Sequence, residues 1–225
     1  LPDRLRDDPR SGPRNDPRNA RIRPRRGRRP RRPAGPDPGR RQEVTRSGVL
    51  GHRVGPMAES VRLRDPEPGD LGWIVQRHGA LYAAEYGWNS DFEGLVARIV
   101  ADFAQDHDPY LERVWIAELD GRPVGSVMCV REDGAPGTAR LRLLLVDPEG
   151  RGHGVGALLV GTVVAFARSV GYRELVLWTN DVLTDARKLY ERAGFTLIAQ
   201  RPHRSYGVSL TGQDWRLPLQ EGRPG

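Results

Sequence analysis

The residues of this sequence whose types and spacing best suit ligand chemistry lie in a glycine-rich turn at 147–156. Gly152, Gly154 and Gly156 alternate with other residues, after an apolar run at 143–146 and before a stretch with helical periodicity. The first amides of a helix have no internal partners and carry the positive end of its dipole. Glycines let a ligand approach the backbone closely, and Arg151 adds positive charge. The turn therefore predicts a site for a phosphate-bearing ligand and leaves the ligand unspecified.

Other interpretations of the turn are open at this point. A Walker loop ends in Lys followed by Ser or Thr, and this turn has neither. A dinucleotide fingerprint has the spacing G-x-G-x-x-G in a first βαβ unit, whereas residues 152–156 give G-x-G-x-G after several expected strands. The remaining alternative is a turn whose glycines only relieve crowding.

Two motifs resemble those of one known family. Residues 151–156 look like the Q/R-x-x-G-x-G/A acetyl-CoA motif of the GNAT superfamily of N-acetyltransferases, and the approach Val146-Asp147-Pro148 is also typical of it. Residues 175–195 resemble the second half of the GNAT core, with a strand, Asn180, and a helix that carries Tyr190. Segments at 144–148, 178–183 and 202–207 look like the acetyltransferase half of bacterial MarR–GNAT fusion regulators. Residues 1–56 are too short and too polar to be a winged-helix half.

The resemblance implies a role for each matching residue. The backbone of Leu145 and Val146 is expected to bind the pantetheine arm, and Asn180 to contact the cofactor where two central strands diverge. Tyr190 is expected to act as general acid for the departing thiolate. Tyr190 as an ordinary half-buried aromatic and Asn180 as an Asx turn are the alternatives. The amides expected to bind the pyrophosphate are those of Arg151, Gly152, His153, Gly154, Val155 and Gly156.

The implied activity is transfer of an acetyl group from acetyl-CoA to a primary amine of a small molecule or peptide. The amine attacks the thioester directly in a ternary complex, so the protein orients two reactants, stabilises an oxyanion through a backbone N–H near Val146 and manages protons. The alternative is a non-catalytic acyl-CoA sensor derived from a MarR–GNAT fusion. It stays open because the strand expected at 139–146 lacks the Glu that some GNAT enzymes carry there.

The acceptor side of the site is less defined. Glu85 and His203 are the candidates for the base, because substrate pockets of this family form from their two regions; a water chain without a dedicated base is the alternative. Glu85 is also a candidate for binding the acceptor ammonium, or is simply an exposed glutamate. His153 is expected to face solvent and Trp178 to pack in its strand. Candidates for the pocket are Tyr82, Tyr86 and Trp88, and for a carboxylate on the acceptor Arg204, Ser205 and Tyr206.

The elements that position these residues follow from apolar periodicity and from turn residues. Strands are expected at 60–64, 113–119, 123–130, 139–146, 174–179, 195–200 and 206–219, with Asp120-Gly121 as a two-residue hairpin turn. Helices are expected at 70–86, with Asp70 as N-cap and Gly87 as terminator, at 91–106, after the glycine turn, and at 184–192. The third helix is expected to pack through Leu158, Leu159, Val163, Phe166 and Val170. The fold class is α/β, a GNAT-like mixed central sheet of about seven strands flanked by about four helices.

The charge of the chain is concentrated at its start. The chain has 225 residues and a net charge of +7. Residues 1–56 hold 17 arginines against six acids, a balance of +11, so the remainder carries −4. Apolar residues are too few there to offset chain entropy, which predicts a disordered tail at 1–57, a domain at 58–220 and a disordered C-terminus at 221–225. Nucleic acid is not expected as a partner except non-specifically through the cluster at 21–32.

Several classes of protein are not expected. The single cysteine, Cys129, forms no intrachain disulfide, and its apolar surroundings favour a buried hydrophobe. We find no Cys/His cluster for a metal, no apolar run long enough to span a membrane and no secretory signal. These observations favour a cytoplasmic protein that uses no metal, and a homodimer is an open alternative to a monomer.

Overall fold

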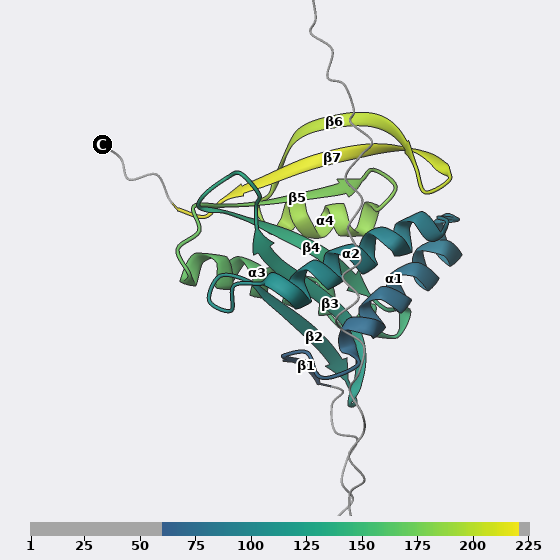
Figure 1. Ribbon diagram of the computed structural model, residues 1–225, viewed down its shortest axis with the longest axis horizontal. Coiled ribbons are helices and arrows are strands. Elements are labelled where there is room, and N and C mark those ends of the chain that lie inside the picture. The colour runs from purple at the N-terminus through teal and green to yellow at the C-terminus, as the bar shows by residue number, and fades with distance from the viewer. Residues whose placement is uncertain (1–59, 221–225) are drawn as a thin grey trace, which may run out of the picture. The chain divides into compact units, whose positions relative to one another are not determined.

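The computed structural model describes residues 60–220, which form a seven-stranded mixed sheet flanked by four α-helices (Figure 1). The strand order is β1-β2-β3-β4-β5-β7-β6, and within this range β4 and β5 are the parallel pair. The predicted mixed α/β fold is thereby confirmed. The strands are β1 (Val61–Arg64), β2 (Arg113–Leu119), β3 (Arg122–Arg131), β4 (Thr138–Val146), β5 (Glu174–Asn180), β6 (Thr196–Ser205) and β7 (Val208–Pro218). The helices are α1 (Asp70–Tyr86), α2 (Ser90–Asp106), α3 (Val155–Ser169) and α4 (Thr184–Arg192), with a short 3-10 helix, η1 (Pro148–Gly150).

Two segments for which predictions were made are not described by the structure. The arginine-rich tail at 1–57, with its cluster at 21–32, and the C-terminal segment at 221–225 lie outside the described residues.

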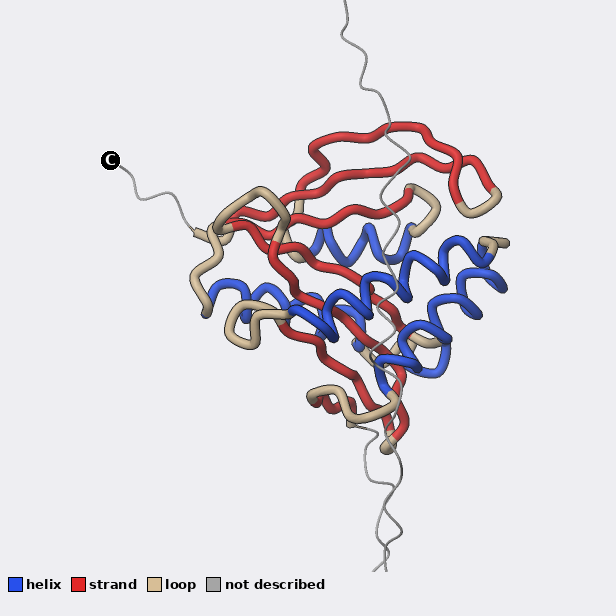
Figure 2. The backbone as a smooth tube through the Cα atoms, viewed as in Figure 1, coloured by secondary structure: helices blue, strands red, loops and turns tan. Residues whose placement is uncertain are grey.

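The chain reverses direction where residues tolerate positive φ. Asp120 and Gly121 have φ of 52° and 75°, which are the left-handed values that a type I′ hairpin turn requires. Gly87, at φ 69°, ends α1, and its N–H donates to the Ala83 carbonyl oxygen at 3.0 Å. These short-range signals explain why several element bounds match the expectation closely. Figure 2 shows the resulting helices, strands and connecting turns.

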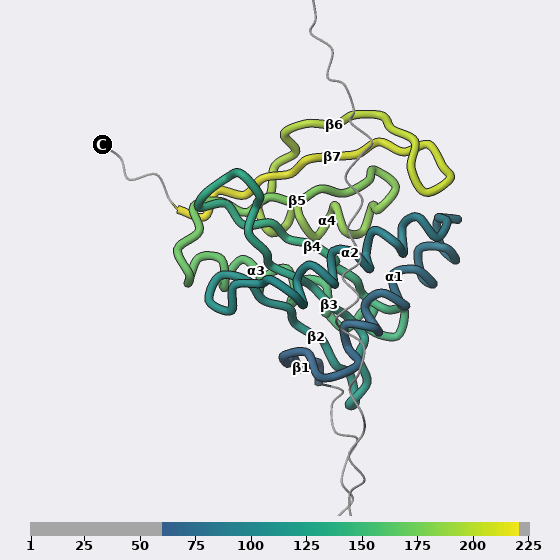
Figure 3. The backbone as a smooth tube through the Cα atoms, viewed as in Figure 1, coloured from purple at the N-terminus to yellow at the C-terminus, as the bar shows by residue number. Residues whose placement is uncertain are grey.

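Two apolar cores lie on opposite faces of the sheet. Alternate residues of β2 divide between them: Val114 and Ile116 pack with Ile74 of α1 and residues of α2, whereas Trp115 and Ala117 pack with residues of α3. This is the period-two alternation of a strand covered on both faces. In Figure 3 the pair α1–α2 crosses in front of the strands of the sheet. The sheet is therefore the middle layer between two helical layers.

The parallel strands β4 and β5 separate along their length. They pair only over Thr138–Arg140 of β4 and Glu174–Val176 of β5. The register between β3 and β4 shifts at Ser126–Met128, and Leu143 opposite this shift has φ 51°. Such a bulge bends a strand and re-aims its side chains. Beyond it, none of the described strands pairs with the β5 side of residues 144–146.

Two local predictions were wrong. Gly69, not Asp70, is the N-cap of α1, because Asp70 is already helical and its carboxylate accepts from Arg64 and from the Glu67 N–H. Leu158 was expected in the core, but its side chain is 41% exposed, since the apolar stripe of α3 centres on Leu159 and Val163.

The prediction for the single cysteine is confirmed. Cys129 is a buried free thiol, as predicted for a small hydrophobe. No helix among the described residues is both long enough and apolar enough to cross a bilayer. Residues 60–220 contain no group of three His, Cys, Asp or Glu side chains arranged to hold a metal ion.

Candidate functional site

The glycine turn leads from β4 into α3 with an open backbone. Gly152 and Gly154 have φ of 82° and 77°, values that favour glycine. A Cβ built on either glycine would have no heavy atom within 4 Å, so the space beside the turn is empty. Gly154 caps α3, and no side chain bonds the first amides of the helix. The geometry provides unpaired N–H donors at the positive end of a 15-residue helix, facing open space.

Gly156 serves packing as well as access. A Cβ at this position would lie 2.6 Å from Cδ1 of Leu189 on α4. Glycine therefore allows α3 and α4 to approach, and Leu189 in turn forms part of the wall beside the turn. On the other side, the Arg77 side chain of α1 donates to the Asp147 carboxylate at 2.6 Å. The turn is thus held between α1 and α4.

A cleft of about 510 Å³ opens at the turn; we call it the glycine-turn cleft. Its floor is the unpaired end of β4, and its walls come from α1, the turn and α4. The residues that line it include Glu85, Tyr86, Leu144, Leu145, Val146, Arg151, Gly152, Gly154, Val155, Gly156, Asp185, Lys188, Leu189 and Arg192. Three of these are cationic and two are acidic. Free amides combined with this charge balance suit an elongated anionic ligand.

An ion pair spans the mouth of the glycine-turn cleft. The Arg151 guanidinium donates to the Glu85 carboxylate at 2.6 Å, and both side chains are partly exposed. Glu85 therefore faces the same space as the turn. It is absent from the wall of the neighbouring cavity.

A second cavity, of about 310 Å³, adjoins the cleft where β4 and β5 diverge; we call it the aromatic cavity. The two spaces share Tyr82, Leu144, Leu183 and Ala186 as wall residues. The aromatic side chains of its wall are His78, Tyr82, Trp88, Phe92, Trp178, Tyr190 and Tyr206, and its other polar residues are Arg140, Arg142, Thr179 and Asn180. A ligand extended along β4 in the cleft would therefore end at a mostly apolar chamber.

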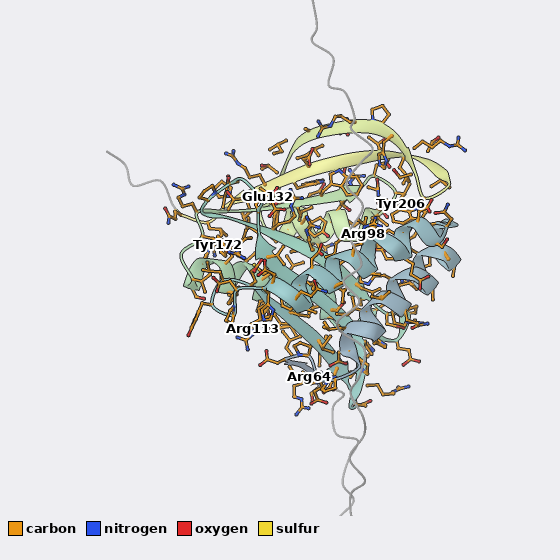
Figure 4. The ribbon with its side chains drawn as sticks, viewed as in Figure 1. Arg64, Arg98, Arg113, Glu132, Tyr172 and Tyr206 are labelled. Carbon is orange, nitrogen blue, oxygen red and sulfur yellow. The ribbon has the colours of Figure 1, made fainter. Side chains whose placement is uncertain are left out.

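The β6–β7 turn closes one side of the aromatic cavity. Tyr206, labelled in Figure 4, lies against the junction of α1 and α2. Its ring centroid is 4.8 Å from that of Trp88 and 5.1 Å from that of Phe92. The Asn89 N–H donates to the Tyr206 carbonyl oxygen at 3.1 Å, which fixes the turn to the helical pair. Segments more than a hundred residues apart in the chain thus meet at this wall.

Tyr190 projects from α4 into the wall of the aromatic cavity. Its side chain is 5% exposed and packs against the Phe195 ring at a centroid distance of 5.8 Å. Burial raises the pKa of the Tyr190 phenol above its ordinary value. The phenol therefore keeps its proton across the neutral range and is a hydrogen-bond donor toward the cavity.

A polar chain lies beside β5. His203 Nε2 is 2.8 Å from Asn180 Oδ1, and His203 Nδ1 is 2.9 Å from the Ser205 Oγ. An amide oxygen only accepts, so in this orientation Nε2 carries a proton toward Asn180, and Nδ1 faces the Ser205 hydroxyl. Asn180 lines the aromatic cavity, whereas His203 and Ser205 are not among its wall residues. His203 thus orients Asn180 through this hydrogen bond without itself lining the cavity.

The structure gathers the predicted site residues into three groups. The cleft contains Glu85, Tyr86 and the expected cofactor residues of β4 and the turn, except His153, which is exposed and outside its wall. The aromatic cavity contains Asn180, Tyr190 and Tyr206. His203 and Ser205 lie behind Asn180, and Arg204 lines neither space.

Sequence reasoning did not identify several residues of the aromatic cavity. Trp178 was expected to pack inside its strand, but it is 41% exposed and lines the cavity. Arg140, Arg142 and His78 were not predicted as site residues. The two arginines stand at alternate positions of an otherwise apolar strand, which places them on one face; that spacing is the signal that could have revealed them.

Comparisons with known proteins agree with this geometry. Residues 76–195 match the family model described as Acetyltransferase (GNAT) family. The chain is 33% identical over 120 residues to a probable N-acetyltransferase camello of Xenopus tropicalis, covering 51% of this chain and 55% of that protein. It is 30% identical to an uncharacterized N-acetyltransferase of Schizosaccharomyces pombe, over 56% of this chain and 74% of that one. With human N-acetyltransferase 8B it shares 40% identity over 38% of this chain and 39% of that protein. The chain thus spans about half or less of two of these three relatives.

Solved structures share the fold. A candidate phosphinothricin N-acetyltransferase has a TM-score of 0.61 and 23% identity, covering 72% of this chain and all of that one. The structure of yncA from Salmonella typhimurium, solved with its cofactor acetyl-CoA, has a TM-score of 0.57 and 21% identity, covering 74% of this chain and 98% of that one.

Proposed function

The chain belongs to the GNAT family of acetyltransferases, and on this premise we propose that it transfers the acetyl group of acetyl-CoA to a primary amine. The observation that carries the proposal is the junction of two spaces. The glycine-turn cleft suits a long anionic ligand, and it opens into the aromatic cavity where the strands diverge. A thioester held in the cleft would meet an acceptor held in the cavity, and transfer between two oriented reactants needs no covalent enzyme intermediate.

The described residues fit acetyl-CoA. The free amides at the start of α3 face open space and suit a diphosphate, with Arg151 beside them. Lys188 and Arg192 add positive charge on α4. The unpaired side of residues 144–146 offers backbone groups to the pantetheine amides, as an added strand would. When bound, acetyl-CoA supplies an activated acyl group.

The residues around the junction would manage charge and protons. A backbone N–H at the end of β4, near Val146, stabilises negative charge that develops on the acyl oxygen. Tyr190, which keeps its proton, donates to the departing sulfur. Asn180, oriented by His203, contributes an amide to the same wall. No nucleophilic side chain takes part.

Proton removal from the amine is assigned to water. Glu85 is paired with Arg151 in the glycine-turn cleft, and His203 lies behind Asn180, so neither residue lines the aromatic cavity. We therefore assign Glu85 to the cofactor cleft and His203 to positioning, in place of the roles expected for them as bases. Among the described wall residues of the cavity there is no carboxylate.

The test uses the full chain. Calorimetry with acetyl-CoA should give one site, and an amine panel should cause amine-dependent release of free thiol. Arg151→Gln should weaken acetyl-CoA binding roughly tenfold, the size of one charge-assisted contact. Arg168→Gln is a matched control, since Arg168 is exposed in the last turn of α3, remote from its N-terminus. Absence of acetyl-CoA binding would refute the proposal.

The absence of a carboxylate from the described wall of the aromatic cavity favours one alternative, a non-catalytic acyl-CoA sensor. This alternative predicts acetyl-CoA binding without thiol release for every amine tested. Amine-dependent thiol release would eliminate it.

A further inference from the structure

Two arginines of β4 point toward the same side of the sheet. Arg140 pairs in register with Val130, and Arg142 pairs with Met128. Met128 and Val130 pack in the core beneath α1 and α2, so the arginine side chains project toward that helical layer. Both arginines line the aromatic cavity.

The two guanidinium groups differ in their partners. Arg140 forms a close ion pair with Glu132, which neutralises its charge. Arg142 has no ion pair and no hydrogen bond among the described residues, and its Nε is sealed from solvent without a partner. Its terminal nitrogens are not among the sealed, unpartnered atoms, and Arg142 is a wall residue of the aromatic cavity. Burial and the adjacent Arg140 charge lower the pKa of Arg142, yet a guanidinium remains cationic.

An unpaired, partly buried charge is costly unless a ligand pairs with it. The described wall of the aromatic cavity holds no acidic side chain, so its fixed charge is positive. The sealed, unpartnered polar atoms of this wall are His78 Nε2, Trp88 Nε1 and Arg142 Nε, of which the last two are donors. The described wall therefore offers no acidic side chain that could pair with Arg142 inside the cavity.

The position of Arg142 suits one end of a short acceptor. Arg142 precedes Leu144 by two residues, across the irregular backbone at Leu143, and Leu144 belongs to both the cleft and the cavity. A volume of about 310 Å³ accommodates a molecule of amino-acid size and not a folded peptide. The remaining aromatic wall suits an apolar side chain.

We propose, resting on the proposed function, that the acceptor is an amine of amino-acid size that carries a carboxylate, and that Arg142 binds this carboxylate. Arg142 replaces Arg204 in this role, because Arg204 lines neither the cleft nor the cavity. A charge-assisted, two-pronged contact would hold the acceptor so that its amine reaches the junction with the cleft.

The experiment compares natural L-amino acids with their decarboxylated amines, for example L-leucine with isoamylamine and L-phenylalanine with phenethylamine. Binding to the full chain saturated with CoA is measured by calorimetry, and thiol release is measured separately with acetyl-CoA. Wild-type protein should bind at least one amino acid about tenfold or more tightly than its decarboxylated partner. Arg142→Gln should remove this preference by a loss of about 10- to 100-fold in affinity for the amino acid alone.

Arg98→Gln is the matched control. Arg98 is an exposed arginine of α2, labelled in Figure 4, so the same charge is removed outside the cavity. Retained acetyl-CoA binding shows that Arg142→Gln is folded, and Arg142→Lys should recover part of the preference.

The outcomes separate the two proposals. Equal binding of both members of every pair, or an equal loss for both in Arg142→Gln, overturns the carboxylate assignment even if thiol is released. A carboxylate preference that depends on Arg142 without thiol release supports the assignment and contradicts acetyl transfer. Neither binding nor thiol release with any member of the panel overturns both.

Discussion

Arg151 and Glu85 stand 66 residues apart in the chain, yet the Arg151 guanidinium lies 2.6 Å from the Glu85 carboxylate. The pair joins the glycine turn to the end of α1 at the mouth of the cleft. The Glu85 carboxylate pairs with the positive charge of Arg151, and a bound diphosphate would pair with the same charge. Glu85 is therefore a competitor of the ligand at this arginine, which leads to a first prediction.

Glu85→Gln should leave kcat within about threefold of wild type and lower the KM for acetyl-CoA by about two- to fivefold. The change removes a negative charge from beside the anion site and frees Arg151. Steady-state kinetics with one amine checks this. A general base would behave differently, since its loss costs about 10² to 10⁴-fold in rate; a fall of that size would restore Glu85 as base.

Tyr190→Phe should lower kcat by about 10² and leave acetyl-CoA affinity within about threefold. The substitution removes the buried hydroxyl and keeps the ring that packs against Phe195. Kinetics and calorimetry on the same preparation measure the two quantities. A rate equal to that of wild type would exclude Tyr190 from proton donation.

The raised pKa of Tyr190 also limits the pH dependence. Because the protonated phenol is the active form and its folded-state pKa lies above the ordinary value of 10, Tyr190 causes no loss of rate up to about pH 10. A pH–rate profile of wild type and Tyr190→Phe measures this. An alkaline limb below pH 9 that is absent from the variant would contradict it.

Gly156→Ala should weaken acetyl-CoA binding by about fivefold, because its Cβ would lie 2.6 Å from Leu189 and displace a wall of the cleft. Gly161→Ala is the matched control in the same helix, where a Cβ meets nothing within 4 Å. It should raise the free energy of unfolding by about 0.5 to 1 kcal/mol through helix propensity and leave binding unchanged. Equal binding by both variants would show that α3 and α4 tolerate separation.

His78 should make the folded state sensitive to acid. Its ring is fully buried, its Nδ1 donates to the Ile74 carbonyl oxygen at 2.8 Å, and burial lowers its pKa from 6.5 to about 4. Below pH 6.5 His78 takes up a proton in the unfolded chain, but in the folded chain it does so only near pH 4. The free energy of unfolding therefore falls as pH falls from 6.5 to 4. The loss is about 3 kcal/mol between pH 6.5 and 4.

Urea unfolding of wild type and His78→Leu at several pH values measures this contribution. Carboxylates held by arginines, such as Asp70 and Glu118, also lose stability in acid, so the quantity compared is the difference between the two proteins. The free energy of unfolding of wild type minus that of His78→Leu should fall as pH falls. A difference independent of pH would show that His78 titrates normally in the folded state.

The sequence predicted those parts of the molecule that depend on neighbouring residues. Asp120-Gly121 required a type I′ turn, and Gly87 required a helix end, because few residues adopt left-handed backbone. The glycine-turn cleft could also be predicted, since one contiguous motif supplies the strand end, the turn and the helix start. The mixed sheet followed from the order of these elements.

The aromatic cavity could not be predicted to the same extent, because its wall comes from distant segments. Tyr206 reaches Trp88 only through the β6–β7 turn, and the left-handed backbone at Leu143 has no signature in a run of leucines. Asp70 has the side chain of a helix cap, but in the structure its carboxylate accepts from Arg64 of β1. Glu85 looked available as a base for the same reason: its partner Arg151 is remote in sequence.

The most direct test of the account is whether acetyl moves from acetyl-CoA to an amine. The full chain is incubated with acetyl-CoA and a panel of primary amines, and mass spectrometry of the amines is combined with a thiol assay. The account predicts one acetylated amine formed for each thiol released, at a rate that falls about 10²-fold in Tyr190→Phe. Acetyl-CoA binding without any acetylated amine would contradict it.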